Sequence, residues 1–316
     1  MTTTTTTPPA RREHGHQRRA RVPDRRRRDP GGRARTGVLL VAPAFAFVVA
    51  FVLVPLGFAV YISLTNWPLI GRYRFIGLDN YRLLVEDPGF WHALGYTLVY
   101  TLIVTPLILL FGYLLAMLVR SRRPGTTLLR TAVFLPYVIG LTTLSFFALL
   151  ELQPTSGVVN FLLDAVGLPG STTNWLIETV PATAAICALV VWGASGLTVV
   201  LIMAAMQGVP DDVYEAAALD GATAWQREVR ITMPLLRRTI TLATILSVIG
   251  SILAFNQFFI LTAGGPGTST QTIVMWIYNK AFVELRVGAA TAGSLVLVAI
   301  IALLSAVQYR LMRSDT

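Results

Sequence analysis

The chain has 316 residues, of which 54% are hydrophobic and 13% are charged, and its formal net charge is +10 at pH 7. So high an apolar fraction with so few charges excludes an ordinary water-soluble domain. The single cysteine excludes an intrachain disulfide and a cysteine-based zinc site, and the three histidines are too scattered to suggest a metal centre. We therefore expect a membrane protein with no metal, no cofactor and no catalytic residues.

The first 36 residues are a basic tail. They contain eleven arginines, a run of threonines and several prolines, with almost nothing apolar to bury. Such a composition is typical of disordered segments. The four arginines at 25–28 are a pattern found in nucleic-acid-binding segments, but beside an apolar run they are more simply an anchor on anionic membrane lipid. We expect a disordered cytoplasmic tail over 1–36 that contacts lipid and binds no nucleic acid.

Six apolar runs follow the tail, and none contains Asp, Glu, Lys, Arg or His. Each reaches the roughly 20 residues needed to cross about 30 Å of hydrocarbon at about 1.5 Å per residue. The sequence therefore predicts an all-α membrane protein whose transmembrane domain covers 37–316. Its six transmembrane helices are expected at roughly 37–64, 93–119, 131–150, 181–206, 239–262 and 287–309.

The basic residues set the expected orientation. If the spans alternate in direction, 21 of the 26 arginines and lysines fall in the tail, the two even-numbered loops and the C-terminus, and five fall in the other loops. Basic residues concentrate on the cytoplasmic side of membrane proteins. We therefore expect cytoplasmic N- and C-termini, and a cytoplasmic loop at about 207–238, in a multi-pass chain of the cell membrane.

The three outer loops carry different patterns. The first contains aromatic rings such as Trp67 and Tyr73, which settle at the level of lipid headgroups. In the second, residues 157–163 have the composition of a short interfacial helix that Pro169 ends. The third contains Gly264-Gly265-Pro266, which predicts a tight turn.

The polar stretch 210–234 between the fourth and fifth runs favours helix. Asp212 and Glu215 have the spacing of a capping box, in which two side chains satisfy the free N–H groups at a helix start. The alanines that follow have high helix propensity, and Gly221 supplies a residue that tolerates positive φ where a helix stops. These residues predict a helix of about two turns that starts at Asp212.

A second short helix is expected directly afterwards. Thr223 and Gln226 repeat the capping-box spacing. Pro234 lacks the backbone N–H that a continuing helix needs, so we expect this helix to end just before it. The loop should therefore fold as helix, sharp turn, helix.

Several motifs resemble those of a known family. In the loop they are Glu215-Ala216-Ala217, Asp220-Gly221-Ala222, Ile231 and Pro234, and outside it they are residues 75–81, Gly264-Gly265-Pro266, Tyr278 and Phe282. The loop is similar to the cytoplasmic coupling loop of ABC importer permeases, which docks on an ATPase. The outer segments resemble the first permease subunit of carbohydrate importers such as the maltose and glycerol-phosphate systems. The similarity runs from about residue 40 to the C-terminus.

The resemblance implies a fold, partners and a site. The fold is that of a type I ABC importer permease in a prokaryotic plasma membrane. The partners are a pair of ABC ATPase subunits, a second permease subunit and an extracellular or lipid-anchored solute-binding protein. The ATPase would couple through Glu215, Ala216, Ala217, Asp220, Gly221 and Ala222. The chain departs from the family at Glu228, where an aromatic residue is usual, and its third span lacks the usual tryptophan.

The energy source has to come from another protein. A Walker A motif requires Gly-Lys-Ser or Gly-Lys-Thr, and the only lysine, Lys280, lies between Asn279 and Ala281. Ion-driven transporters normally carry an ionisable group inside the membrane, and the six runs have none. We therefore expect a non-enzymatic subunit driven by a separate ATPase. A secondary transporter, or a channel, is the less favoured alternative.

Candidate substrate contacts are polar or aromatic residues inside the spans. Asn256 and Gln257 lie together in the fifth run, where two amides are costly without partners; they contact either solute or a neighbouring helix. Trp192 and Ser195 can share one face of the fourth helix, although packing is the simpler role. Tyr137 lines the third span or anchors it at the interface.

These observations predict the permease subunit of an ATP-driven importer that moves a sugar or sugar-like solute by alternating access. The alternative is a permease of the same architecture for another class of solute, such as an amino acid or an oxyanion. The turn at Gly264-Gly265-Pro266 and the aromatic outer segments favour carbohydrate through their resemblance to the carbohydrate permeases.

Overall fold

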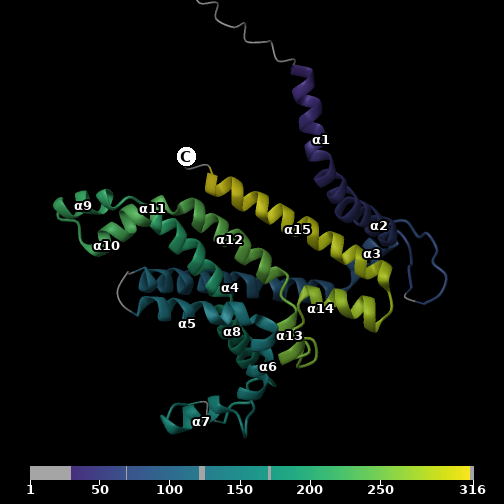
Figure 1. Ribbon diagram of the computed structural model, residues 1–316. Helices are drawn as coiled ribbons and strands as arrows, with labels where there is room; N and C mark the ends of the chain where they lie inside the picture. Colours follow the sequence, from purple (N-terminus) through teal and green to yellow (C-terminus); the bar gives the residue numbers. More distant parts are fainter. Residues whose placement is uncertain (1–29, 69, 121–124, 170–171, 314–316) are drawn as a thin grey trace, which may run out of the picture. The chain divides into compact units, whose positions relative to one another are not determined.

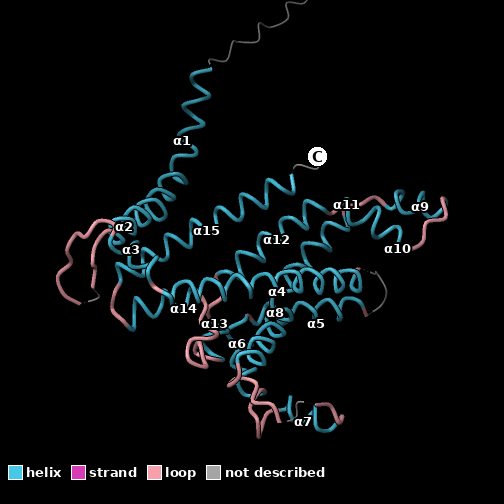
Figure 2. Tube along the Cα trace, turned by 180° about the vertical axis from the view of Figure 1, so that it is seen from behind, coloured by secondary structure: helices cyan, strands magenta, loops and turns pink. Residues whose placement is uncertain are grey.

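The computed structural model describes residues 30–68, 70–120, 125–169 and 172–313 (Figure 1). In these ranges every extended regular element is a helix, as Figure 2 shows, and the only β pairing is two isolated bridges. The all-helical prediction is therefore confirmed for the described residues. The chain divides into two compact units, 1–55 and 56–316, which are described one at a time.

The first unit contains α1 (Pro30–Val48) and the π-helical turn η1 (Val49–Leu53). The predicted tail extends to residue 36, whereas α1 begins at Pro30. Residues 1–29 lie outside the described part of the chain, so the predicted disorder there is not tested. The first candidate span is Leu39–Ser63, which continues through α2 (Val54–Ser63), and its most apolar window has no buried residue.

The second unit contains the remaining candidate spans. Counting the first, five helices among the described residues are long and apolar enough to cross a membrane, and a sixth span is present there if one bent helix pair is counted as a single crossing. The positions predicted for the second, fourth, fifth and sixth runs are thereby confirmed as long apolar helices. They are α4 (Pro88–Val119), α8 (Thr179–Gln207), α12 (Arg237–Ile252) with α13 (Asn256–Leu261), and α15 (Val287–Arg313).

The third run is not one straight helix. It is divided into α5 (Thr126–Ile139) and α6 (Leu141–Glu151), whose axes differ by 93°. The bend is at Gly140, which has φ 85° and ψ 148°. A side chain disfavours this backbone conformation, whereas glycine adopts it readily. The prediction of a continuous third span is therefore wrong, and the missing Cβ of Gly140 is the reason.

Substitution of Gly140 by alanine should lower stability. A Cβ would meet no atom within 4 Å there, so the expected cost of about 1 kcal/mol comes from the positive φ alone. Thermal unfolding of the purified chain in detergent should show a lower midpoint for Gly140→Ala. Gly95→Ala is the matched control, because Gly95 lies inside α4 with equally open surroundings and no positive φ. Equal midpoints for the two variants would contradict this account of the bend.

The fifth run is interrupted at 253–255. α12 ends at Ile252 and α13 starts at Asn256. The Ala254 carbonyl at the break accepts a hydrogen bond of 2.9 Å from the Thr272 hydroxyl. A backbone group freed inside an apolar bundle needs such a partner. The break therefore places two adjacent amides at the start of a new helix, of which Asn256 is exposed and Gln257 is buried.

The helix α4 is at the centre of the second unit. It contributes residues to each of the three buried apolar clusters found among the described residues. The first cluster also includes α8, α13 and α14 (Ile273–Tyr278), the second α3 (Asp79–Glu86), α12, α14 and α15, and the third α8 and Leu236. Figures 1 and 2 both place α9 (Asp211–Leu219), α10 (Ala224–Arg227) and α11 (Met233–Leu235) at the end of the bundle where α4 ends, and α3 and α14 at the opposite end. α3 of the first predicted outer loop and α14 of the third therefore lie at the same end of the bundle.

The three predicted outer loops contain short helices and turns held by hydrogen bonds. Asn80 in α3 (Asp79–Glu86) donates hydrogen bonds of 2.7 Å to the carbonyls of Ser63 and Thr65, which fixes the first loop. The predicted helix of the second loop is present as α7 (Val158–Ala165). The third loop turns at Gly265, whose N–H donates to the Thr262 carbonyl. It leads into α14 (Ile273–Tyr278) and the π turn η3 (Asn279–Val283).

Asp87 joins two of these outer segments to α4. Its side chain accepts a 2.7 Å hydrogen bond from Gly89 N–H at the start of α4 and pairs with Lys280 of η3 at 3.1 Å. Partial burial opposes ionisation, but the Lys280 ammonium and the Gly89 N–H outweigh it and lower the pKa of Asp87 below its usual value. The carboxylate therefore stays ionised and holds η3 against α4.

Candidate coupling loop and central cavity

The first helix of the loop that was predicted to be cytoplasmic is α9 (Asp211–Leu219). It starts one residue before the predicted position, after Pro210, and no side chain caps it. The predicted capping box of Asp212 and Glu215 is therefore wrong. Asp211 and Asp212 both lie in the first turn instead, where carboxylates interact favourably with the positive end of the helix dipole.

The end of α9 is as predicted. Gly221 has φ 77°, the Gly221 N–H donates to the Ala218 carbonyl at 3.1 Å, and the Ala222 N–H donates to the Ala217 carbonyl at 2.9 Å. These two bonds form a Schellman motif, which closes a helix with a left-handed residue. Gly221 therefore fixes the angle between the two helices of the loop.

The second helix starts as predicted but does not end as predicted. The capping box of Thr223 and Gln226 is formed at the start of α10 (Ala224–Arg227), with bonds of 2.8 and 3.3 Å. Beyond it the chain continues through the π turn η2 (Glu228–Thr232) and α11 (Met233–Leu235) toward α12. Pro234 lies in the first turn of α11, where a missing N–H is tolerated. The predicted stop before Pro234 is therefore wrong.

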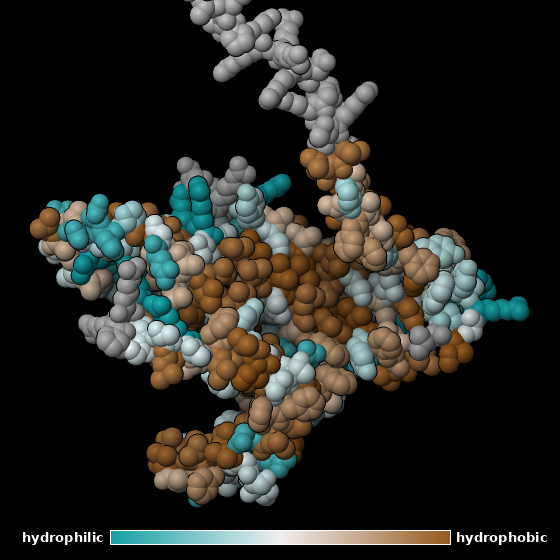
Figure 3. Space-filling model, in the orientation of Figure 1, coloured by the Kyte–Doolittle hydropathy of each residue, from teal (hydrophilic) through white to brown (hydrophobic). Residues whose placement is uncertain are grey.

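The predicted coupling residues form an accessible ridge. Glu215, Ala216 and Asp220 are exposed, whereas Ala217 is buried. Sequence reasoning missed Leu219 and Trp225, whose side chains are 90% and 72% exposed beside these carboxylates. Figure 3 shows hydrophilic residues gathered over this loop and apolar ones over the helices beyond it. The ridge combines small residues, carboxylates and apolar side chains, as docking surfaces do.

A cavity of about 160 Å³ lies among α4, α5, α6, α8, α12 and α13. None of the described residues that line it is charged. The Tyr100 hydroxyl is buried near Gln257 but makes no hydrogen bond to any described residue. The cavity therefore offers neutral donors and acceptors to a solute. Its polar lining consists of Tyr100, Tyr137, Thr198, Ser247, Ser251 and Gln257.

The structure brings together only some of the predicted path residues. Gln257 and Tyr137 both line the cavity. Asn256 is exposed and donates a 3.0 Å hydrogen bond to Thr142 of α6, so it contacts a neighbouring helix. Ser195 is buried, and its hydroxyl donates a hydrogen bond to the Trp192 carbonyl. The Trp192 side chain is half exposed. Neither residue lines the cavity.

Sequence reasoning missed four hydroxyl residues of the cavity: Tyr100, Thr198, Ser247 and Ser251. Ser247 and Ser251 are four residues apart in α12 and therefore share one helix face. Two hydroxyl residues with that spacing in an apolar run indicate a polar helix face, and this was the signal that could have predicted them. Tyr137 reaches the cavity because α5 crosses α8 closely at Gly196, where a Cβ would lie 2.5 Å from the Tyr137 Cβ.

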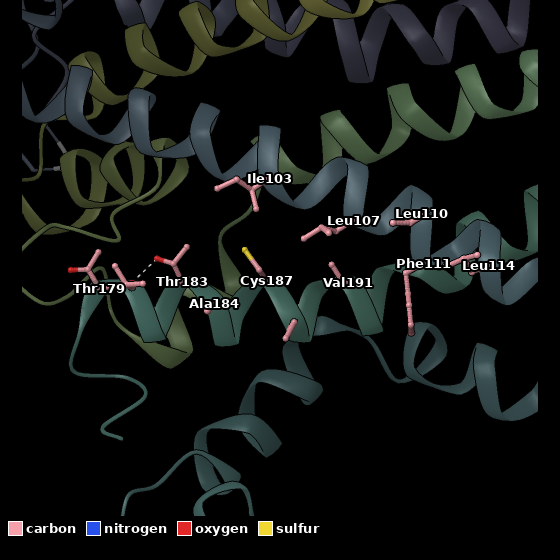
Figure 4. A pocket seen from close by; sticks show the side chains of 12 residues that line it. Ile103, Leu107, Leu110, Phe111, Leu114, Thr179, Thr183, Ala184, Cys187 and Val191 are labelled. Atoms are coloured by element: carbon pink, nitrogen blue, oxygen red, sulfur yellow. Dashed lines mark hydrogen bonds between the residues drawn. The ribbon is translucent and has the colours of Figure 1, made fainter. Parts of the chain in front are cut away.

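A second, larger groove of about 720 Å³ lies between α4 and α8 (Figure 4). Its lining is almost entirely apolar, including Ile103, Phe111 and Val191, and the hydroxyl of Thr183 is already bonded to the Thr179 carbonyl. A polar solute would find few partners there. The groove suits a lipid chain or an apolar helix, whereas the smaller central cavity has the groups that a polar solute needs.

Comparison with known proteins places the chain in a family. The family model described as "Binding-protein-dependent transport system inner membrane component" matches residues 122–314. The chain belongs to this family. This permease is 34% identical over 282 residues to the lactose transport system permease protein LacF of Rhizobium radiobacter, an alignment that covers 86% of this chain and 92% of LacF.

A second relative and a solved structure extend the comparison. The permease is 32% identical over 283 residues to the sulfoquinovosyl glycerol transport system permease protein SmoG of Agrobacterium fabrum, covering 88% of this chain and 90% of SmoG. A chain of a bacterial alginate ABC transporter, crystallised with an alginate-bound periplasmic protein, superimposes with a TM-score of 0.79 at 21% identity. It covers 90% of this permease and 96% of that chain, and it shows that the two share a fold.

Proposed function

We propose that the permease is the transmembrane subunit of an ATP-driven importer for a sugar or sugar-like solute, and that it works by alternating access. The observation that carries the proposal is the exposed ridge of α9, with Glu215, Ala216 and Asp220 accessible beside Leu219 and Trp225. A rigid helix that presents such residues at one end of an apolar bundle is suited to receive force from another protein.

The proposal includes a topology. Six spans, with α5 and α6 counted as one bent crossing, would leave both termini and the α9 loop in the cytoplasm, as the basic residues indicate. The fold would be that of a type I importer permease, and residues 37–316 would form its transmembrane domain. The coupling loop would then lie on the side where ATP is available.

The proposal also includes partners. Glu215, Ala216, Ala217, Asp220, Gly221 and Ala222 would contact one of a pair of ABC ATPase subunits, which supplies the hydrolysis that this chain does not perform. A second permease subunit would complete the pathway, and an extracellular or lipid-anchored solute-binding protein would deliver the solute. The family description and the alginate transporter crystallised with its periplasmic protein support a delivery protein.

A carbohydrate is supported by the relatives and by the central cavity. LacF and SmoG are named for carbohydrate-containing solutes. The cavity offers the hydroxyls of Ser247 and Ser251 and the amide of Gln257 without a charge, and sugar hydroxyls need such replacement hydrogen bonds when they leave water. Three other residues would contact the solute only in a conformation in which the helices are rearranged: Asn256, Trp192 and Ser195.

Reconstitution in vesicles tests the proposed function directly. The chain with a second permease, the ATPase pair and the binding protein should accumulate labelled sugar only when ATP is present on the ATPase side. The same chain reconstituted alone should accumulate none, because its described spans contain no ionisable group within their apolar runs to couple to an ion gradient. Accumulation by the chain alone would refute the ATP-driven mechanism.

A further inference from the structure

A buried contact joins the coupling loop to the central helix. Glu228 of η2 is 7% exposed and accepts a hydrogen bond from the Tyr113 hydroxyl of α4. A carboxylate so far removed from water is costly unless it is hydrogen-bonded. The tyrosine hydroxyl supplies that bond, so the pair is a defined connection between two elements that are 115 residues apart in sequence.

The π turn η2 faces both α4 and α9. Its first residue, Glu228, and its last, Thr232, are buried, while Val229 and Arg230 between them are exposed. The Thr232 hydroxyl lies 3.2 Å from the hydroxyl of Tyr214, which belongs to α9. The one turn therefore contacts α4 through Glu228 and α9 through Thr232.

A second contact reinforces the first. Arg120, directly after α4, lies over the Tyr214 ring with its guanidinium carbon 4.6 Å from the ring centre. A cation over an aromatic face is a favourable interaction. Tyr113 and Arg120 are seven residues apart, about two helical turns, and so share a helix face. The cytoplasmic-side end of α4 is thus attached to α9 directly and to η2 through Glu228.

The other end of this connection is the cavity. Tyr100 and Ile108 of α4 line it, and α4 also contributes to each of the three buried apolar clusters. Packed interiors transmit displacement because they deform little. A movement of α4 therefore changes the cavity, provided that the coupling loop and α4 move together.

We propose that Glu228 and Tyr113 are positioning residues that fix the coupling loop to α4, so that displacement of α9 moves α4 and the cavity as one body. The inference rests on the proposed function, because it concerns the path of force from the docked ATPase. Without the hydrogen bond, α9 moves relative to α4 and part of the displacement is lost. ATP is then hydrolysed with less solute moved.

The test is the number of solute molecules taken up per ATP hydrolysed, measured in one preparation of vesicles that contain the complete transporter. Tyr113→Phe removes only the donor hydroxyl. It should lower this ratio about fivefold while ATP hydrolysis stays within about twofold of the unsubstituted level. Tyr96→Phe is the matched control, because the Tyr96 hydroxyl of the same helix bonds Thr183 of α8 at 2.8 Å, away from the loop. It should keep the ratio unchanged.

A conservative variant separates positioning from folding. Glu228→Gln keeps an acceptor oxygen for Tyr113 and should retain at least about half of the ratio. The double variant Tyr113→Phe with Glu228→Gln should have the same ratio as Tyr113→Phe alone. An unchanged ratio in Tyr113→Phe, or an equal loss in Tyr96→Phe, overturns the inference. Failure of both Tyr113→Phe and Glu228→Gln to assemble also overturns it, because the contact then serves folding. Absence of uptake with the unsubstituted chain instead counts against the proposed function.

Discussion

Substitution of Glu215 by lysine should abolish ATP-driven uptake, with a loss of at least about a hundredfold. Glu215 is exposed on α9, so the change disturbs no internal contact of the described chain. In the assembled transporter its carboxylate would be covered by the ATPase, where a basic partner is expected. A reversed charge at a covered contact costs several kcal/mol, enough to separate the loop from the ATPase.

Uptake of labelled sugar and ATP hydrolysis should be measured together for this variant. Hydrolysis should continue although uptake is lost, and the permease should still reach the membrane. Asp164→Lys is a suitable control, because Asp164 is an exposed carboxylate of α7 on the predicted outer side. It makes the same change of charge away from α9. Normal uptake by Glu215→Lys would remove the main support for the coupling role of this loop.

Local backbone chemistry explains why part of this loop was predictable. Gly221 and the capping box of Thr223 and Gln226 act within a few residues of the chain, and both are found as predicted. The box of Asp212 and Glu215 has the same spacing but is not formed. An acidic residue in a first turn is stabilised by the helix dipole with or without the capping bond, so the spacing alone did not decide the start of α9.

The predictions that failed depend on packing or on unusual helix geometry. Pro234 ends no helix, because the preceding π turn lets the chain restart with proline in its first turn. Gly140 bends the third span, and one glycine inside an apolar run is compatible with either a bend or a straight helix. Hydropathy located the apolar helices well, because composition over about 20 residues outweighs such local events.

Only some of the residues that line the central cavity could be predicted from the sequence. Five residues were predicted to contact solute because of their chemistry. Gln257 and Tyr137 line the cavity, whereas Asn256, Trp192 and Ser195 do not. Which side of a span faces the interior depends on the break at 253–255 and on the crossing of α5 over α8. These features arise from contacts between distant segments. Composition and spacing contain no information on them.

Replacement of Gln257 by leucine should lower the rate of sugar uptake by a factor of between about ten and a hundred. Gln257 is 4% exposed, and its amide is part of the polar lining of the cavity. Leucine has a similar size but cannot bond a sugar hydroxyl, which would enter the cavity without a replacement for its water partners. The loss should appear mainly as a lower rate of transport at saturating binding protein, because the proposed delivery protein would set the apparent affinity for the sugar.

Two further variants distinguish a solute contact from general damage to the fold. Gln207→Leu makes the same change at the exposed end of α8, and its uptake should stay normal. Asn256→Leu removes the neighbouring amide, which bonds Thr142 outside the cavity, so its uptake should fall less than that of Gln257→Leu. If the Asn256 variant lost more uptake than the Gln257 variant, the solute would pass on the Thr142 side of α13. The cavity would then be a packing space and not part of the pathway.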